Sequence, residues 1–279
     1  MKRFLVALSL VMAMCFAIVP NAAFAASAYQ TPFSVSITYQ NVGSAVATVN
    51  VSFFAENNGT AQNFSAGTLA AGASASLSVG KAISSGSFKG SAVLSSDQPV
   101  IATIVQFDST STVKNRPLSN GFGAADGAAK QLIATVLKNQ FSSSTIFSVQ
   151  NTESSPVNVT AQFFAVGSTS ATATVTANNL PAGAAKYFDV GSIAQLPSGF
   201  NGSAIVTAKL SSNNSTAGKV VVTVNELDTA GGIAKSFEGS SVSGAKVYMP
   251  SATCSVFQSN SVRSSGSDPP SRSQPTLAP

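Results

Sequence analysis

The residues that could do nucleophilic or acid–base chemistry are few and scattered in this chain of 279 residues. Histidine is absent, which removes the commonest general base and the commonest zinc ligand. Serine precedes lysine by three positions at Ser78/Lys81, Ser111/Lys114 and Ser243/Lys246. Serine–lysine nucleophiles use this spacing, but the Lys-Thr-Gly motif that accompanies them is missing. Because serine is abundant, chance explains the three pairs.

Two carboxylates, Glu226 and Asp228, lie two positions apart at the end of a predicted strand. Side chains two positions apart on a strand face the same way, so a calcium site or a glycosidase pair is conceivable. The alternative is a solvated strand end, because the matching positions earlier in the chain hold Gln106 and Asp108. We favour the solvated strand end.

Three further features suggest binding or crosslinking. Lys138, Asn225 and Glu226 are candidates for a lysine–asparagine isopeptide crosslink with an acid beside it. An exposed Tyr187 would offer a ring face to a sugar, although tryptophan is absent and most phenylalanines fit core positions. Asn-x-Ser/Thr acceptors for glycosylation occur at Asn58, Asn63, Asn158, Asn201 and Asn214. We expect no catalytic, cofactor-binding or metal-binding residues.

The elements that would position these residues show an internal repetition. "TYQNVGSAVATVNVSFF" (38–54) matches "SVQNTESSPVNVTAQFF" (148–164) at an offset of 110 residues. Later matches include "GSAV" with "GSAI" at 112 and "VIATIVQFD" with "VVVTVNELD" at 120. The offset grows only in turn-like segments such as Ser211–Gly218, as insertions in loops do.

The matched stretches have the pattern of β-strands. In "VNVTAQF" (157–163), Val, Val, Ala and Phe face one way and Asn, Thr and Gln the other, a period of two that buries one face of a sheet. Asn41 and Asn151 are predicted to close side-chain turns, and Gly72 and Gly183 to adopt positive φ. Short strands over about 100 residues predict two tandem antiparallel β-sandwiches of immunoglobulin type.

The pattern QN-x-G-S-A-x-A-x-V-x-V-x-F-F, followed by L-x-A-G-A-S, resembles the CARDB-like and related immunoglobulin-like repeats of bacterial secreted and surface proteins. The resemblance covers Phe33–Asp108 and roughly Lys130–Asp228. The turn "TESSP" lacks the glycine of the first copy, which departs from the pattern there. The resemblance implies spacers, stalks or adhesive modules.

The N-terminus predicts export. A basic pair (2–3) precedes an apolar run (4–19), and the small residues of "AFA" end at Ala25, which is typical of a signal peptide; an N-terminal membrane anchor is the alternative. After cleavage Cys254 is the single cysteine, so we expect no intrachain disulfide. No second apolar stretch approaches the roughly 20 residues of a membrane span.

The pattern predicts the following order: signal peptide 1–25, sandwich repeat 26–112, linker 113–129, sandwich repeat 130–228, linker 229–245, the first strand of an incomplete third repeat 246–257, and a disordered tail 258–279. The tail is rich in serine and proline and has too few apolar residues to form a core. It is either a functional tail or the result of a truncated or frame-shifted repeat array.

Charge is sparse, at 9% of residues with a net charge of +5, against about 25% charged residues in typical soluble domains. The lysines are scattered, so we expect no nucleic-acid binding. The sequence predicts a non-catalytic structural or adhesive protein, secreted or at the cell surface. Its expected partners are other surface proteins, cell-wall or extracellular polymers, or further copies of itself. The alternatives are a donor-strand polymer using 246–257 and a carbohydrate-binding module.

Overall fold

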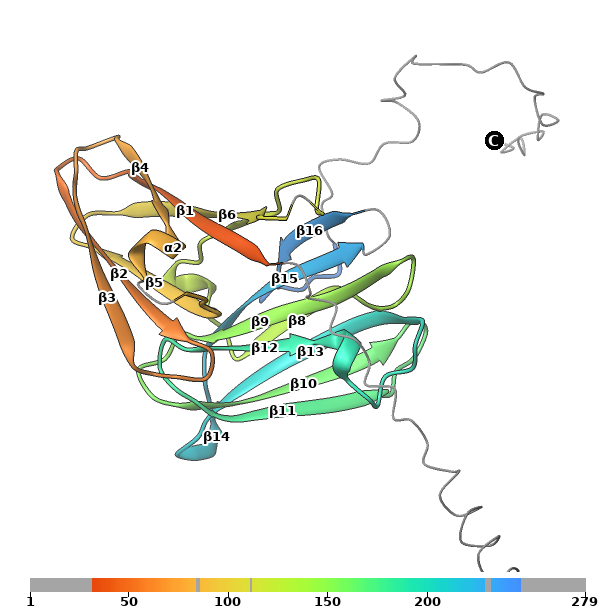
Figure 1. Cartoon of the computed structure of the whole chain (residues 1–279). Coiled ribbons are helices and arrows are strands. Elements are labelled where there is room, and N and C mark those ends of the chain that lie inside the picture. Colours follow the sequence, from red (N-terminus) through yellow and green to blue (C-terminus); the bar gives the residue numbers. More distant parts are fainter. Residues whose placement is uncertain (1–31, 84–85, 111, 229–231, 247–279) are drawn as a thin grey trace, which may run out of the picture. The chain divides into compact units, whose positions relative to one another are not determined.

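Antiparallel β-strands form almost all of the regular structure in the computed structural model (Figure 1), which describes residues 32–83, 86–110, 112–228 and 232–246. The chain divides into a unit ending at Val242 and a C-terminal unit beginning at Ser243. Every strand named below belongs to the first unit. The predicted signal peptide, the tail 258–279 and all but Lys246 of the segment 246–257 lie outside the described residues.

Two sheets come from the part of the chain that we call the first segment (32–120). Its strands are β1 (Phe33–Asn41), β2 (Ala47–Ala55), β3 (Ala61–Leu69), β4 (Ser74–Ser78), β5 (Gly90–Ser96), β6 (Val100–Asp108) and β7 (Leu118–Asn120), with the short helix α2 (Val79–Ala82) after β4. One sheet has the order β4-β1-β6-β7 and the other β3-β2-β5.

Two further sheets come from the second segment (124–240). Its strands are β8 (Lys130–Lys138), β9 (Ser143–Asn151), β10 (Val157–Ala165), β11 (Ala173–Leu180), β12 (Ala185–Asp189), β13 (Phe200–Leu210), β14 (Asn213–Ala217), β15 (Val220–Asp228) and β16 (Ile233–Glu238), with 3-10 turns η1 (Ala124–Asp126) and η2 (Val190–Ser192). One sheet has the order β12-β9-β15-β16; the other runs β11-β10-β13-β14, with β8 also paired to β13. The segments 113–129 and 229–245, expected to be linkers, contain β7 and β16.

The period of two directs apolar side chains to the inside of each pair of sheets. In β10, Val157, Val159, Ala161 and Phe163 are buried while the residues between them are partly exposed. The buried core of the second segment draws on both of its sheets, and so does that of the first. The predicted alternation is confirmed.

The prediction of an all-β, antiparallel chain is confirmed, but the finer one of two tandem immunoglobulin domains is not. The four sheets correspond to a four-bladed, propeller-like arrangement. Here β5 pairs with β2, whereas β6 pairs with β1, and β15 likewise pairs with β9 while β13 pairs with β10. Strand alternation does not specify which strands pair, so the sequence pattern did not reveal this topology.

The asparagine of the repeated phrase connects both sheets of its segment. Asn41 is fully buried. Its side-chain Nδ2 donates to the carbonyls of Ala45 (2.7 Å) and Leu69 (3.0 Å), and its Oδ1 accepts from the Gly43 N–H (2.9 Å). Its backbone N–H donates to the Ala73 carbonyl (3.0 Å), and its backbone carbonyl accepts from the Gly72 N–H (2.9 Å). These partners flank β2, β3 and β4. A buried amide with every group paired holds these turns together.

Asn151 has the same environment in the second segment. Its Nδ2 donates to Ser155 (2.9 Å) and Leu180 (3.0 Å), its Oδ1 accepts from the Glu153 N–H (2.8 Å), its N–H donates to Ala184 (3.0 Å), and its carbonyl accepts from the Gly183 N–H (3.1 Å). Gly72 and Gly183 have φ of +76° and +72°, which favours glycine. Both predicted turns are confirmed.

Replacing this amide tests its structural role. Asn41→Ala leaves two carbonyls and one N–H without their partner, so we expect the free energy of unfolding to fall by about 2–4 kcal/mol. Asn50→Ala, at an exposed position of β2, is the matched control and should change it by less than about 0.5 kcal/mol. The measurement is chemical denaturation of both variants. Equal effects would contradict the proposed role of the buried amide.

Candidate functional site

The two segments meet where β5 lacks a strand neighbour. In the second segment β13 is paired with β10 on one side and β8 on the other, with Gly202 opposite Val136 and Ala204 opposite Ile133. Among the described residues, the matching strand β5 pairs only with β2. Side chains of the second segment donate hydrogen bonds to the free edge of β5 instead.

Two carbonyl groups on the edge of β5 accept hydrogen bonds from the second segment. The hydroxyl of Tyr187 donates to the Gly90 carbonyl at 2.7 Å, and Nε2 of Gln150 donates to the Ala92 carbonyl at 3.3 Å. Nε2 of Gln150 also donates to the Gly183 carbonyl at 3.0 Å. Backbone groups at a strand edge need partners when water is excluded, and these side chains supply them.

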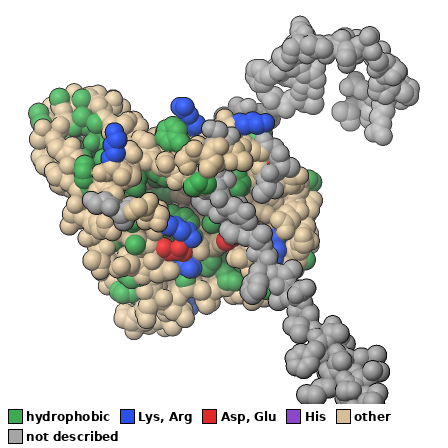
Figure 2. All heavy atoms as spheres, viewed as in Figure 1, with side chains coloured by type: hydrophobic (Ala, Val, Ile, Leu, Met, Phe, Trp, Pro, Cys, Tyr) green, Lys and Arg blue, Asp and Glu red, His purple; other side chains and the backbone are tan. Residues whose placement is uncertain are grey.

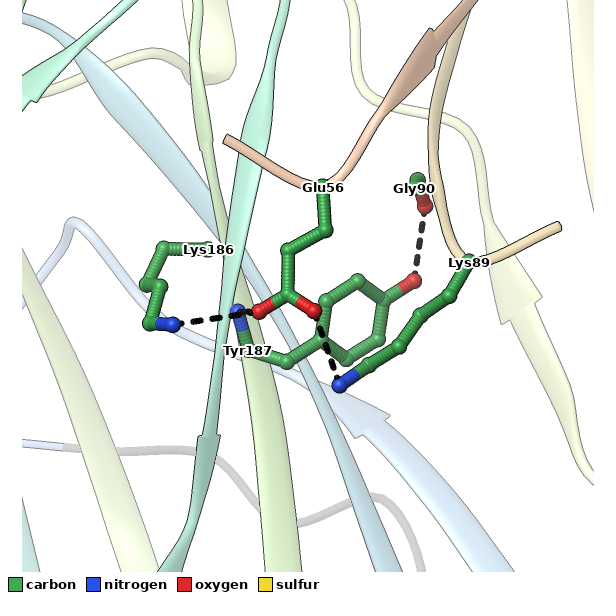
Figure 3. A network of polar contacts seen from close by, with 5 residues as sticks. All are labelled: Glu56, Lys89, Gly90, Lys186 and Tyr187. Carbon is green, nitrogen blue, oxygen red and sulfur yellow. Dashed lines mark hydrogen bonds and ion pairs between the residues drawn. The ribbon is translucent and has the colours of Figure 1, made fainter. Parts of the chain in front are cut away.

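Glu56 is the charged centre of this junction (Figure 3). Its Oε1 accepts from Nζ of Lys186 at 3.2 Å and from the N–H of Tyr187 at 3.1 Å. Its Oε2 pairs with Nζ of Lys89 at 2.9 Å. The Lys89 ammonium also lies 4.7 Å from the centre of the Tyr187 ring, a cation–π distance. The Glu56 carboxylate of the first segment therefore forms an ion pair with one lysine from each segment.

An apolar contact completes the junction. Phe54 packs against the buried core of the second segment, whereas its neighbour Phe53 is buried in the core of the first. The Phe54 ring lies over Gly183, where an added β-carbon would come within 2.7 Å of the ring. The two adjacent phenylalanines, Phe53 and Phe54, thus pack into the cores of different segments.

The junction shifts the pKa of two groups. Burial by itself raises the pKa of the Glu56 carboxyl, but hydrogen bonds from Lys89 and the Tyr187 N–H and the charges of Lys89 and Lys186 outweigh it, so the pKa lies below its ordinary value of 4.5. Burial, together with the negative charge of Glu56, raises the pKa of the Tyr187 phenol to about 12, against the hydrogen bond to Gly90. The carboxylate is therefore charged and the phenol neutral at pH 7.

A second candidate site is a polar groove on the outer face of the sheet containing β10 and β13. Its volume is about 390 Å³, and only polar side chains line it: Asn158, Thr160, Gln162, Asn178, Thr207, Lys209 and Asn214. The alternation of β10 had predicted that Asn158, Thr160 and Gln162 face away from the core, but not that β14 adds a wall to this face.

The sequence candidates for nucleophilic chemistry do not form a site. Ser78 ends β4 and Lys81 is an exposed residue of α2. Ser243 and Lys246 lie in an exposed segment, and the remaining pair falls partly outside the described residues because Ser111 is not among them. Among the described residues, no three Cys, Asp or Glu side chains lie close enough together to hold a metal ion.

The three isopeptide candidates have separate partners. Nζ of buried Lys138 donates to the carbonyls of Ile193 (2.7 Å) and Leu196 (2.9 Å), Oδ1 of Asn225 accepts from Nε2 of Gln106 (3.1 Å), and Oε1 of Glu226 pairs with Lys235 (2.8 Å). The geometry therefore does not bring Lys138 and Asn225 together for a crosslink. Glu226 is buried and paired with Lys235, so the prediction of a solvated strand end is wrong for Glu226, whereas Asp228 is partly exposed.

Tyr187 is not an exposed sugar platform, because its hydroxyl is bonded to Gly90 and Lys89 lies over its ring. The glycosylation acceptors Asn58, Asn63 and Asn214 are exposed, and Asn158 and Asn201 are partly buried. Sequence reasoning missed Glu56 and Lys186 altogether. The one available signal was that Glu56 is among only ten acidic residues in the chain.

No family model matches the chain, and neither the curated proteins nor the solved structures contain a match. The resemblance to CARDB-like repeats stays a prediction. Among the described residues, no helix has the length and apolar character needed to cross a bilayer.

The lowered pKa of Glu56 predicts how acid affects the junction. A carboxylate with a depressed folded-state pKa stabilises the fold above its unfolded pKa, and this contribution is lost as pH falls through the folded-state value. Wild-type protein should therefore lose thermal stability on acidification below about pH 4.5. Glu56→Gln should be less stable at pH 7 and lose less over the same window.

The measurement is the midpoint of thermal unfolding between pH 7 and pH 3. Glu153→Gln removes the same charge from a partly exposed turn residue and serves as the control, with a profile like that of wild type. If Glu56→Gln also follows the wild-type profile, Glu56 does not hold the segments together.

Proposed function

We propose that this chain is an exported, non-catalytic structural or adhesive protein of the cell surface, in which two sandwich-type units of one repeated design form a stiff spacer. The observation that carries the proposal is the junction: Glu56, Tyr187 and Gln150 link the two segments by charged and neutral hydrogen bonds, and Phe54 adds apolar contact. A spacer that holds its two ends at a fixed distance needs a close contact of this kind between its units, because units without one move relative to each other.

The repeated design is supported by the two asparagines. The same five hydrogen bonds surround Asn41 and Asn151, and a glycine with positive φ follows each at the same place in the turn. In each segment the strand that ends in Gln-Asn pairs with the strand of the last matched phrase: β1 with β6 and β9 with β15. One unit used twice accounts for these correspondences better than two unrelated folds.

The surface supports an extracellular structural role. Figure 2 shows a face on which charged side chains are few and an acidic group lies beside basic ones. The exposed strand positions carry mainly Ser, Thr, Asn and Gln. Such a surface limits non-specific charge pairing.

Export and stiffness can be tested together on the full chain. We expect the mature protein to begin at Ala26 and to be recovered from the surface or the medium. Spin labels on cysteines placed at exposed Gln62 and Thr176, with Cys254→Ser, should give one narrow distance, and Glu56→Gln should broaden it. Retention of residues 1–25 on protein inside the cell would contradict export, and a broad distance in wild type would contradict the spacer.

A second candidate function is a donor-strand polymer, favoured by the free edge of β5. The stretch Ala245–Phe257 matches Ala129–Phe141, which includes β8. The segment 246–257 of one chain would take the place beside β5 of a second chain that β8 takes beside β13. It would have to displace the hydrogen bonds that Tyr187 and Gln150 make to that edge.

Deleting residues 247–257 tests this candidate. Mass photometry should show oligomers of the wild-type chain and only monomers of the deletion, whereas a chain lacking 258–279 should still assemble. Monomers in every sample would exclude donor-strand assembly and leave the spacer proposal standing. A carbohydrate-binding module built on Tyr187 is not favoured, because this side chain belongs to the junction.

A further inference from the structure

Part of the polar groove comes from a hairpin that the described residues of the first segment do not have. The offset between matching residues rises from 112 at Gly90/Gly202 to 120 at Val100/Val220, so the second segment carries eight additional residues here. They form the hairpin of β13 and β14, in which Lys209 pairs with Ala217 and Leu210 with Asn213. Asn214, a groove residue, comes from this hairpin.

The first segment serves as an internal comparison for the same sheet face. Asp97 occupies the position of Lys209, at the offset of 112. Its Oδ1 accepts a hydrogen bond from the N–H of Thr48 at 2.7 Å, so its carboxylate caps a strand of its own segment. The second segment has a lysine instead, and Lys209 makes no hydrogen bond or ion pair with the described residues. A structural cap has been replaced by an available cation.

The groove is organised before any ligand arrives. Nδ2 of Asn158 donates to Oδ1 of Asn214 at 2.8 Å, and Oδ1 of Asn158 accepts from the Asn179 N–H and the Ser211 hydroxyl, both at 2.9 Å. These bonds hold the hairpin against β10 and orient one amide at the groove. The side-chain amide of Gln162 makes no hydrogen bond within the described residues. Fixed donors and acceptors lower the entropic cost of binding.

The lining excludes some ligands and favours others. Sites for apolar small molecules are lined mainly by hydrophobic side chains, and this groove has none. Amide and hydroxyl groups exchange hydrogen bonds with ligand hydroxyls in both directions. The single ammonium of Lys209 suits one carboxylate or phosphate.

We propose that the groove binds an anionic, hydroxyl-rich polymer strand, with Lys209 on the acidic group and Asn158, Gln162 and Thr207 on the hydroxyls. This inference rests on the adhesive role proposed above and names the class of polymer that the second segment holds. A uronic-acid polysaccharide and a polyol phosphate share the required chemistry.

The test is direct binding of the full mature chain to poly(galacturonic acid), poly(glycerol phosphate) and neutral dextran, by biolayer interferometry at low and physiological salt. We expect binding to at least one anionic polymer, weaker at higher salt, and none to dextran. Lys209→Gln should weaken it about tenfold, the size of one hydrogen bond to a charged group. Whichever anionic polymer binds identifies the source of the acidic group.

Lys219→Gln is the matched control, because it removes the same charge from an exposed residue outside the groove and should retain affinity within about twofold. Gln162→Ala should weaken binding without changing the unfolding midpoint. Equal losses from Lys209→Gln and Lys219→Gln, equal binding of dextran, or no binding by wild type would each overturn the proposal. The spin-label distance and the surface location test the spacer role independently of polymer binding. Loss of polymer binding alone would therefore contradict the groove proposal and leave the spacer proposal standing.

Discussion

The buried carboxamides of Asn41 and Asn151 are the interactions on which the arrangement of the sheets depends. Each connects the end of one core strand to turns on both sheets of its segment, and each has all of its polar groups paired. A carboxamide offers two N–H donors and a carbonyl acceptor in one uncharged group, and Asn41 uses all three, so no apolar residue can replace it there. The hydrophobic alternation supplies most of the favourable free energy of burial, but these amides fix where the chain crosses from sheet to sheet.

A second constraint, the free edge of β5, explains why the two segments are joined closely. The buried core of the first segment has eight residues among those described, and that of the second has 22. A smaller core leaves a domain marginally stable. Contact with Tyr187, Gln150 and Lys186 therefore both pairs the edge and adds stability. The same edge explains why a donor strand is the natural competitor of this contact.

The two segments differ where they face solvent. The first uses Asp97 to cap its own strand, whereas the second has Lys209 and an added hairpin that together frame a polar groove. In the proposed function, the first segment is the structural unit that docks on the second, and the second carries the groove for a polymer.

The sequence by itself determined the strands and turns, because these depend on neighbours in the chain: the alternation of Val157 to Phe163, the Asx-turns of Asn41 and Asn151, and the positive φ of Gly72 and Gly183. It also showed that the serine–lysine pairs lack the motif of an active site. Only the tertiary structure decided that β6 pairs with β1, that Glu56 meets Lys186, and that the residues 211–218 wall a groove. These contacts join positions far apart in the chain, and a local pattern places no limit on which distant edge or side chain a strand will meet.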